Sequence, residues 1–273
     1  MRVAVGLREA TARLSVTSDT ARLDAELLMA HALGQSRSDM LLRFMDAESP
    51  ACFAALVERR ARQEPIAHIV GKQEFYGRVF TVTPATLIPR SDSETVIDAA
   101  QERKADARRI LDLGTGSGAL LLTMLAECPR AQGSGLDCSA AALKVADGNA
   151  HRLGLASRAE WLLSDWHECG WGDALGEFDL ILCNPPYIEE DAGIDVSVRD
   201  YEPALALFSG PDGLADYRVL FPQLRQLLVP QGVAIFEIGA SQGSSVREIA
   251  VEAGFSVEVR PDLAGRDRVI ICT

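Results

Sequence analysis

The decapeptide ILDLGTGSGA, residues 110–119, is the stretch that decides the fold. Its first four residues predict a buried strand, and glycines follow at positions 114, 116 and 118. Glycine lets the backbone turn sharply and approach a ligand without a Cβ clash, and the helix expected next presents free N–H groups. Asp137, expected to end the following strand, suits two hydrogen bonds from ribose hydroxyls. The pattern predicts a nucleoside-binding turn.

Two cofactor classes fit this turn. Gly114-x-Gly116-x-x-Ala119 satisfies the dinucleotide fingerprint of NAD-binding proteins. Asp112, however, precedes the first glycine by two residues and completes the pattern DxGxGxG, which is typical of methyltransferases. S-adenosyl-L-methionine is therefore favoured over NAD.

The chain around this turn predicts an α/β fold. Strands are expected at 110–113, 133–136, 159–163, 178–183, 233–238, 256–259 and 268–272, with helices at 118–127, 139–153 and 214–228. Such alternation is typical of a mainly parallel, Rossmann-like sheet with both faces covered. Only residues 260–267 separate the last two strands, so they are expected to form an antiparallel hairpin at the sheet edge.

The N-terminal part differs in pattern. Residues 1–65 predict short amphipathic helices, residues 73–82 (QEFYGRVFTV) a small hairpin, and residues 94–104 another helix. We expect an N-terminal helical domain over 1–70, a hairpin linker over 71–90 and a catalytic domain over 91–273.

Composition and charge narrow the function. The chain has 273 residues, 48% hydrophobic and 24% charged, which suffices for a real core. Residues 81–273 carry a net charge of −13 and residues 1–80 carry +1, so the larger part lacks the basic footprint of a nucleic-acid-binding protein. The longest run of residues without a charge is too short for a membrane-spanning helix. Arg8 and Glu9 lie where a signal peptide would need an uninterrupted apolar segment. The six scattered cysteines indicate reduced thiols in a cytoplasmic protein without a zinc site.

The fourth expected strand, residues 178–183, runs directly into Asn184-Pro185-Pro186-Tyr187. Ligands of open α/β sheets lie at the carboxyl ends of strands, so this motif is expected beside the methyl donor. The Asn184 side-chain carbonyl and the Pro185 backbone carbonyl can hold both hydrogens of a planar NH₂ group. The two prolines restrict φ and fix these directions, while Tyr187 can pack beside the group. The motif predicts methyl transfer to a conjugated nitrogen, either an amide or a base amine, chiefly by positioning.

Asp165 and Trp166 follow the third expected strand. Asp165 is suited to accept the adenine amino hydrogen and Trp166 to cover the ring. The alternative is a capping aspartate beside a packing tryptophan.

The chain resembles the peptide chain release factor N(5)-glutamine methyltransferases, the HemK/PrmC family of class I methyltransferases. The resemblance covers nearly the whole chain. It rests on the motifs above together with residues 64–71 (EPIAHIVG), 74–77 (EFYG), 87–90 (LIPR) with Glu94, 202–203, 236–239 (FEIG) and 260–268. The family usually reads IPRPxTE where this chain has Ser91 and Ser93.

The resemblance implies a substrate and roles. The side-chain amide of the glutamine in the Gly-Gly-Gln tripeptide of class 1 translation release factors would be methylated. From the residues themselves we expect no metal, no contact with nucleic acid or membrane, and a monomer, since nothing in the sequence demands a dimer. The residues implied to bind the donor are Gly114, Thr115, Gly116, Ser117, Gly118, Asp137, Asp165, Trp166 and Asn184. The residues implied to bind the substrate are Asn184, Pro185, Pro186, Tyr187, Pro89, Arg90 and Glu94. The first four of these also form the catalytic motif.

Other interpretations stay open from the residues. Arg90 and Glu94 either shape the substrate mouth or pair with each other. Arg59, Arg60 and Arg62 either meet an acidic surface of the release factor or form a solvated helix face. A methyltransferase acting on RNA or DNA amino groups is the alternative enzyme, and an NAD(P)-dependent oxidoreductase and a non-catalytic adaptor are the other classes.

Overall fold

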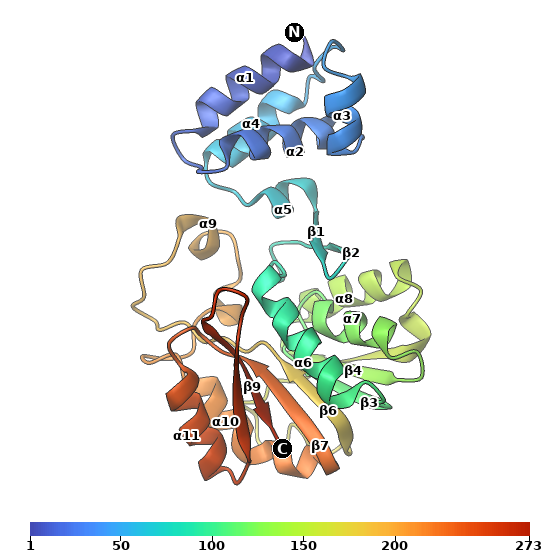
Figure 1. Cartoon of the computed structure of the whole chain (residues 1–273), viewed down its shortest axis with the longest axis vertical. Coiled ribbons are helices and arrows are strands. Elements are labelled where there is room, and N and C mark those ends of the chain that lie inside the picture. The colour runs from blue at the N-terminus through green and yellow to red at the C-terminus, as the bar shows by residue number, and fades with distance from the viewer. The chain divides into compact units, whose positions relative to one another are not determined.

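The computed structural model describes every residue from Met1 to Thr273, and the chain folds into two compact units. One unit contains Met1–Lys72 together with Ile194–Tyr201, and the other contains Gln73–Gly193 and Glu202–Thr273. Figure 1 traces this order along the chain. The segment 194–201, which lies far along the sequence, thus belongs to the N-terminal unit.

The N-terminal unit is all helical. Its elements are α1 (Val3–Leu14), α2 (Ala21–Leu33), α3 (Arg37–Arg43), α4 (Phe53–Ala61), α5 (Ile66–Val70) and α9 (Val196–Arg199). Apolar side chains at helical spacing, such as Leu7 and Leu14 of α1 and Leu28 of α2, form its buried core. Phe53 and Val57 of α4 close this core from another side.

A short hairpin begins at the boundary between the units. It consists of β1 (Lys72–Phe75) and β2 (Arg78–Thr81), as the sequence predicts. Phe75 and Phe80 are buried in the core of the larger unit. The Asn149 side chain accepts from Thr81 N at 2.8 Å and donates to Thr81 O at 3.0 Å, which holds the hairpin against the helix that contains Asn149.

The larger unit is built on a seven-stranded sheet of order β5-β4-β3-β6-β7-β9-β8. The strands are β3 (Arg109–Leu113), β4 (Gln132–Asp137), β5 (Ala159–Leu163), β6 (Phe178–Cys183), β7 (Leu228–Glu237), β8 (Val257–Pro261) and β9 (Asp267–Cys272). The first five are parallel, and β9 runs antiparallel to both β7 and β8. The predicted α/β class and the predicted antiparallel hairpin at the sheet edge are confirmed.

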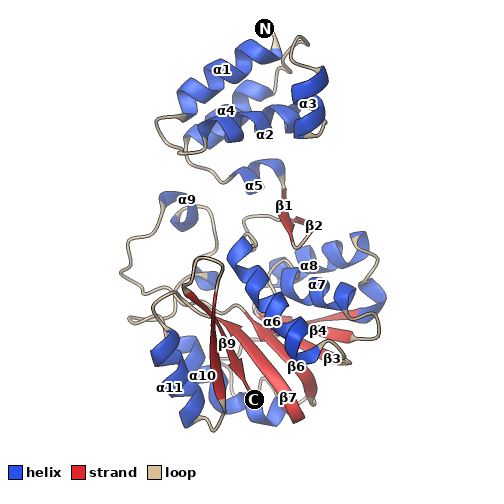
Figure 2. Ribbon diagram, viewed as in Figure 1, coloured by secondary structure: helices blue, strands red, loops and turns tan.

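Helices cover both faces of this sheet (Figure 2). One face carries α6 (Glu94–Lys104), α7 (Ala119–Glu127) and α8 (Ala140–Arg152), and the other carries α10 (Ala215–Leu224) and α11 (Gly243–Glu252). Along β6, Leu180 and Leu182 enter the first core, while Ile181 and Cys183 enter the second. Because both of its faces are covered, β6 is apolar at every position from Leu180 to Cys183.

Single 3-10 turns complete the fold. They are η1 (Ser91–Ser93), η2 (Ala156–Arg158), η3 (Ala204–Ala206) and η4 (Arg225–Leu227). None of the helices combines the length and the hydropathy that a membrane crossing needs.

Candidate active site

Two motifs meet at the carboxyl edge of the sheet because β3 and β6 are neighbours. Leu113 pairs with Cys183 in their parallel ladder, so Gly114 and Asn184 leave the sheet side by side. The glycine-rich turn and the Asn-Pro-Pro-Tyr motif therefore begin at the same place, as the sequence predicts.

The glycine-rich turn requires its glycines. Gly114, Gly116 and Gly118 have φ of 70°, 55° and 79°. Residues other than glycine rarely adopt this region of the backbone. The N–H groups of Gly114 and Thr115 both donate to Leu136 O at 2.9 Å, which ties the turn to the end of β4. A Cβ at Gly114 would lie 3.1 Å from the Trp166 ring, so the turn is also tightly covered.

Asp112 lies under this turn and is 1% exposed. Its Oδ2 accepts from Thr115 Oγ1 at 2.7 Å, while Oδ1 is buried without a hydrogen-bond partner. Burial raises the pKa of Asp112 to about 7, against the lowering effect of the Thr115 hydroxyl. A buried, half-satisfied carboxylate at a cavity wall suits a cationic ligand group.

Asp137, at the end of β4, is already engaged by the backbone. Its Oδ2 accepts from Gly116 N at 2.8 Å and its Oδ1 from Ser139 N at 2.9 Å. Burial raises its pKa, and these two N–H groups lower it. Each oxygen retains a lone pair, because a carboxylate offers about four acceptor sites.

The segment after β5 places Asp165 and Trp166 at the same cavity. Asp165 Oδ1 accepts from His167 N at 2.9 Å, and the His167 Nδ1 atom lies at the same distance. These contacts with His167 lower the pKa of Asp165. Trp166 Nε1 donates to Asp216 Oδ1 at 2.7 Å, which fixes the indole. Sequence reasoning missed Asp216, whose only signal is its place at the start of a helix.

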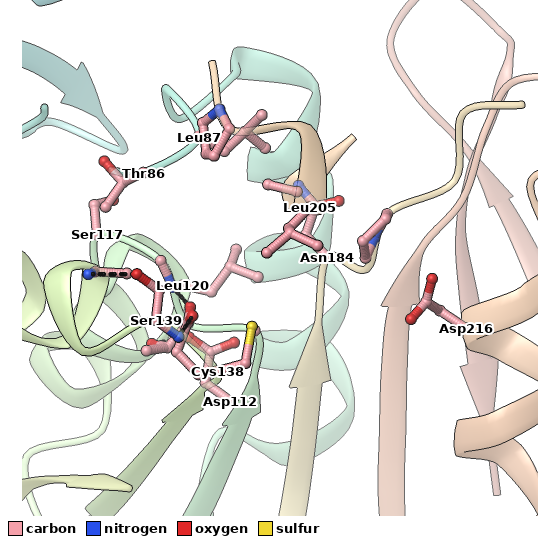
Figure 3. A pocket seen from close by; sticks show the side chains of 18 of the residues that line it. Thr86, Leu87, Asp112, Ser117, Leu120, Cys138, Ser139, Asn184, Leu205 and Asp216 are labelled. Atoms are coloured by element: carbon pink, nitrogen blue, oxygen red, sulfur yellow. Dashed lines mark hydrogen bonds between the residues drawn. The ribbon is translucent and has the colours of Figure 1, made fainter. Parts of the chain in front are cut away.

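A cavity of about 420 Å³ joins these groups. That volume lies in the range of small-molecule sites. Figure 3 shows Asp112, Ser117, Cys138 and Asn184 around it, with Leu205 from another segment. The predicted residues that line it are Gly114, Thr115, Gly116, Ser117, Asp137, Asp165, Trp166, Asn184, Pro186 and Pro89. Gly118, Pro185, Tyr187, Arg90 and Glu94 are not among its lining residues.

Polar contacts hold the Asn184–Tyr187 motif, one of them with Ser93, which also lines the cavity. Asn184 Nδ2 lies 3.4 Å from Ser93 Oγ. The Tyr187 hydroxyl donates to Glu237 Oε1 at 3.1 Å, and its carbonyl accepts from Gln242 Nε2 at 3.0 Å. Burial and the nearby Glu237 raise the pKa of Tyr187, so it stays a neutral donor.

Arg90 and Glu94 do not pair with each other. Arg90 forms an ion pair with the buried Glu202, which also accepts from Ile88 N at 2.9 Å. Glu94 Oε1 accepts from Tyr76 N at 2.8 Å and so holds the turn of the hairpin. Glu202, which the sequence marked only within the resemblance, fixes the strand-like segment before α6.

The arginines of α4 are largely engaged within their own unit. Arg60 Nε donates to Asp24 Oδ2 at 2.6 Å, and Arg59 forms two hydrogen bonds with Glu64. Arg59 and Arg60 thus each have an acidic neighbour within the unit, and whether these arginines also meet a release factor stays open. No group of three or more histidine, cysteine, aspartate or glutamate side chains is placed to hold a metal ion.

Two family models match the chain. Residues 7–71 match the PrmC N-terminal domain, and residues 91–200 match the methyltransferase small domain. Among curated relatives, the release factor glutamine methyltransferase of Cereibacter sphaeroides is 43% identical over 99% of this chain and 98% of its own length. The proteins of the same name from Moorella thermoacetica and Agrobacterium fabrum are 42% and 41% identical, and cover 97% and 91% of this chain and 96% and 89% of their own lengths.

Solved structures of methyltransferases share the fold of a large part of the chain. A methyltransferase from Pyrococcus furiosus superposes with a TM-score of 0.53 and 16% identity, covering 79% of this chain and 97% of its own. A ribosomal protein L11 methylase from Lactobacillus delbrueckii superposes with a TM-score of 0.51 and 21% identity. The match covers 74% of this chain and 89% of that protein. At these identities the likeness concerns architecture alone.

Proposed function

The chain belongs to the family of release factor glutamine methyltransferases, and from this premise we propose its reaction in detail. It transfers the methyl group of S-adenosyl-L-methionine to the side-chain amide nitrogen of the glutamine in the Gly-Gly-Gln tripeptide of class 1 translation release factors. One observation carries the proposal: Asn184 and the glycine-rich turn line a single cavity.

The chain's residues fit the proposed donor. S-adenosyl-L-methionine supplies an electrophilic methyl group on a sulfonium and carries an ammonium. The unpartnered Asp112 Oδ1 suits that ammonium, and the lone pairs left on Asp137 suit the ribose hydroxyls. Gly114 to Gly118 cradle the methionine part, while Asp165 and Trp166 frame the adenine.

The acceptor site is built for a weak nucleophile. The Asn184 side-chain oxygen and the Pro185 carbonyl each accept one hydrogen of the glutamine NH₂ group, with Pro186 and Tyr187 beside it. The amide nitrogen then bonds to the methyl carbon as the carbon–sulfur bond breaks, and the electron pair stays on sulfur. The amide proton leaves to solvent. Positioning supplies most of the acceleration because no strong base faces this point.

The walls of the cavity limit what can enter. Pro89 forms one wall, and the Arg90–Glu202 pair fixes the segment that carries it. Glu94 contributes by holding the hairpin turn rather than by touching substrate. We further propose that the N-terminal unit binds a second part of the release factor, and that the enzyme works as a monomer in the cytoplasm, where release factors act.

Transfer of a labelled methyl group tests the proposal. The purified protein is mixed with labelled S-adenosyl-L-methionine and a release factor, and in parallel with the same factor carrying Gln→Ala in its Gly-Gly-Gln tripeptide. Label on the unaltered factor alone is expected. Label on total RNA and on neither factor would instead identify an RNA amino-methyltransferase that uses the same fold and donor site.

A further inference from the structure

A row of polar groups adjoins Asn184, and its first member, Ser93, also lines the cavity wall. Ser93 ends η1, Glu237 ends β7, and Tyr187 follows β6. Ser93 is 4% exposed and Glu237 is 1% exposed. Two other elements thus supply one hydroxyl and one carboxyl beside the motif that contains Asn184 and the Tyr187 phenol.

The direction of the Asn184 amide decides what this site can bind. The side chain has a carbonyl oxygen that accepts and an NH₂ group that donates, on opposite branches of one plane. An NH₂ group of a substrate needs the oxygen to face the cavity. The opposite orientation would present two hydrogens to two hydrogens. The observed contact places Nδ2 toward Ser93 Oγ, 3.4 Å away.

Glu237 supplies the polarity that maintains this orientation. An ionised carboxylate only accepts hydrogen bonds. Burial raises the pKa of Glu237, whereas the Ser93 hydroxyl, the Arg268 guanidinium and the Tyr187 hydroxyl lower it. The negative charge of Asp92 also raises the pKa of Glu237. Oε1 accepts from Tyr187, and Oε2 is buried without a hydrogen-bond partner, so it is available to accept the hydroxyl proton of Ser93.

We propose that Glu237 and Ser93 are positioning residues that hold the Asn184 side-chain oxygen toward the acceptor nitrogen. The ionised Glu237 attracts the hydroxyl proton of Ser93. The Ser93 oxygen then has only lone pairs left for Asn184, and these accept from Nδ2. The inference rests on the proposed function, in which Asn184 Oδ1 accepts from the substrate amide.

The substitution Glu237→Gln keeps the shape of the side chain but can reverse the donor and acceptor roles along this row of hydrogen bonds. The new amide can donate to Ser93, which frees the Ser93 proton for Asn184. That proton seeks Asn184 Oδ1 and turns the Asn184 NH₂ group toward the cavity. Ser93→Ala removes the link altogether, whereas Ser93→Thr keeps the hydroxyl.

The test compares these three variants in the full-length enzyme with a release factor as substrate. Misorientation of one reacting-site group is expected to lower kcat about 10- to 100-fold in Ser93→Ala and Glu237→Gln. Ser93→Thr is expected to restore kcat to within about threefold of the unaltered enzyme. The Kd for S-adenosylhomocysteine and the Tm are expected to stay unchanged for both Ser93 variants. Ser134→Ala, which removes a buried hydroxyl from β4, serves as the matched control and is expected to keep kcat.

A pH profile gives a second readout that a purely structural role would not move. The kcat of the unaltered enzyme is expected to fall in acid as Glu237 is protonated, at a pH above the ordinary pKa of glutamate because burial raises it. This decline is expected to be absent from Glu237→Gln.

Each outcome has a distinct meaning. An unchanged kcat in Ser93→Ala, beside an inactive Asn184→Ala, overturns this inference and leaves the proposed function standing. Equal losses in Ser93→Ala and Ser93→Thr, or losses that track a fall in Tm, likewise overturn it. If the unaltered enzyme binds S-adenosylhomocysteine but methylates no release factor, the proposed function fails and this inference fails with it.

Discussion

Asn184 follows a strand whose side chains alternate between two cores, and this alternation sets where it points. Cys183 is buried under the α10 side of the sheet, and the following prolines stiffen the turn. The backbone therefore fixes the position of Asn184, and Ser93 fixes its rotation. Both determine which chemistry the site can perform.

Replacing Asn184 separates acceptor binding from donor binding. Asn184→Ala is expected to lower kcat about 100- to 1000-fold, because one of the two acceptors that align the amide is lost. Its Kd for S-adenosylhomocysteine, measured by calorimetry, is expected to remain within about threefold of the unaltered value. A variant that methylates release factor at the normal rate would contradict the acceptor site.

The raised pKa of Asp112 predicts a pH-dependent donor affinity. Only the ionised carboxylate attracts an ammonium, so binding weakens as the pH falls through about 7. S-adenosylhomocysteine is expected to bind about tenfold more weakly at pH 6 than at pH 8. Asp112→Asn is expected to bind weakly at both values, since no charge remains to titrate. Asp137 also has a raised pKa, so the same titration in Asp137→Asn identifies its share. Equal affinity at both pH values in the unaltered enzyme would refute the role of Asp112.

The same residue has a signed effect on stability. Because the folded pKa of Asp112 is raised, the native state holds its proton longer than the unfolded chain does. Its ionisation therefore lowers the free energy of unfolding as the pH rises from about 4 to about 7. Denaturant melts at about pH 4 and about pH 7 give the change in the free energy of unfolding between these two pH values, and this change is expected to be smaller in Asp112→Asn. The same change in the variant and in the unaltered protein would show that another group causes it.

Asp137 provides a test of the donor pocket from its ribose side. Asp137→Ala is expected to weaken S-adenosylhomocysteine binding by about 1–3 kcal/mol, the usual cost of leaving hydrogen bonds to a charged acceptor unmade. Glu248→Ala, which changes an exposed carboxylate of α11, is the matched control and is expected to bind normally. Equal affinities in the two variants would move the ribose to another residue.

At the scale of elements, the sequence predicted most of what periodicity can report. The strands β5 and β6 and the helix α6 begin and end at the predicted residues. Apolar runs and helical spacing can be read from residues that are close together in the sequence, so they predict such bounds. The contacts of Arg90, Glu94 and Glu202 could not be predicted from the residues, since their partners lie 18 to 114 positions away in the chain. Likewise, nothing local in the sequence indicates that Ser93 and Glu237 meet.

The loop between β6 and α10 supports the acceptor motif through one glycine. Gly213 has φ of 69°, and a Cβ there would lie 2.4 Å from the Tyr187 carbonyl oxygen. Gly213→Ala is expected to destabilise the fold by about 1–3 kcal/mol and to lower kcat, because the strained loop displaces Tyr187. Gly148→Ala, in open space within α8, is expected to leave both unchanged or to stabilise slightly. Thermal melts and methyl-transfer rates of both variants decide the matter.

At the scale of the whole molecule, the segment Ile194–Tyr201 lies within the predicted catalytic domain but folds with the N-terminal unit. The Tyr201 hydroxyl donates to Arg62 O at 2.9 Å within that unit. Tyr201→Phe is expected to make local opening of residues 194–201 easier by about 1 kcal/mol, the net value of one such hydrogen bond. Hydrogen exchange of these amides is expected to speed up about fivefold, while those of β3 stay protected. Unchanged exchange would show that other contacts hold the segment.

This arrangement also constrains how the gene can be rearranged. The chain leaves and re-enters the N-terminal unit, crossing between the units after Lys72, Gly193 and Tyr201. A recombination event that exchanges only the first 72 codons would combine the helices of another protein with the original segment 194–201, against which those helices did not evolve to pack. A hybrid that inherits the recognition unit of another family member must therefore inherit two separate stretches of coding sequence, which have to diverge together.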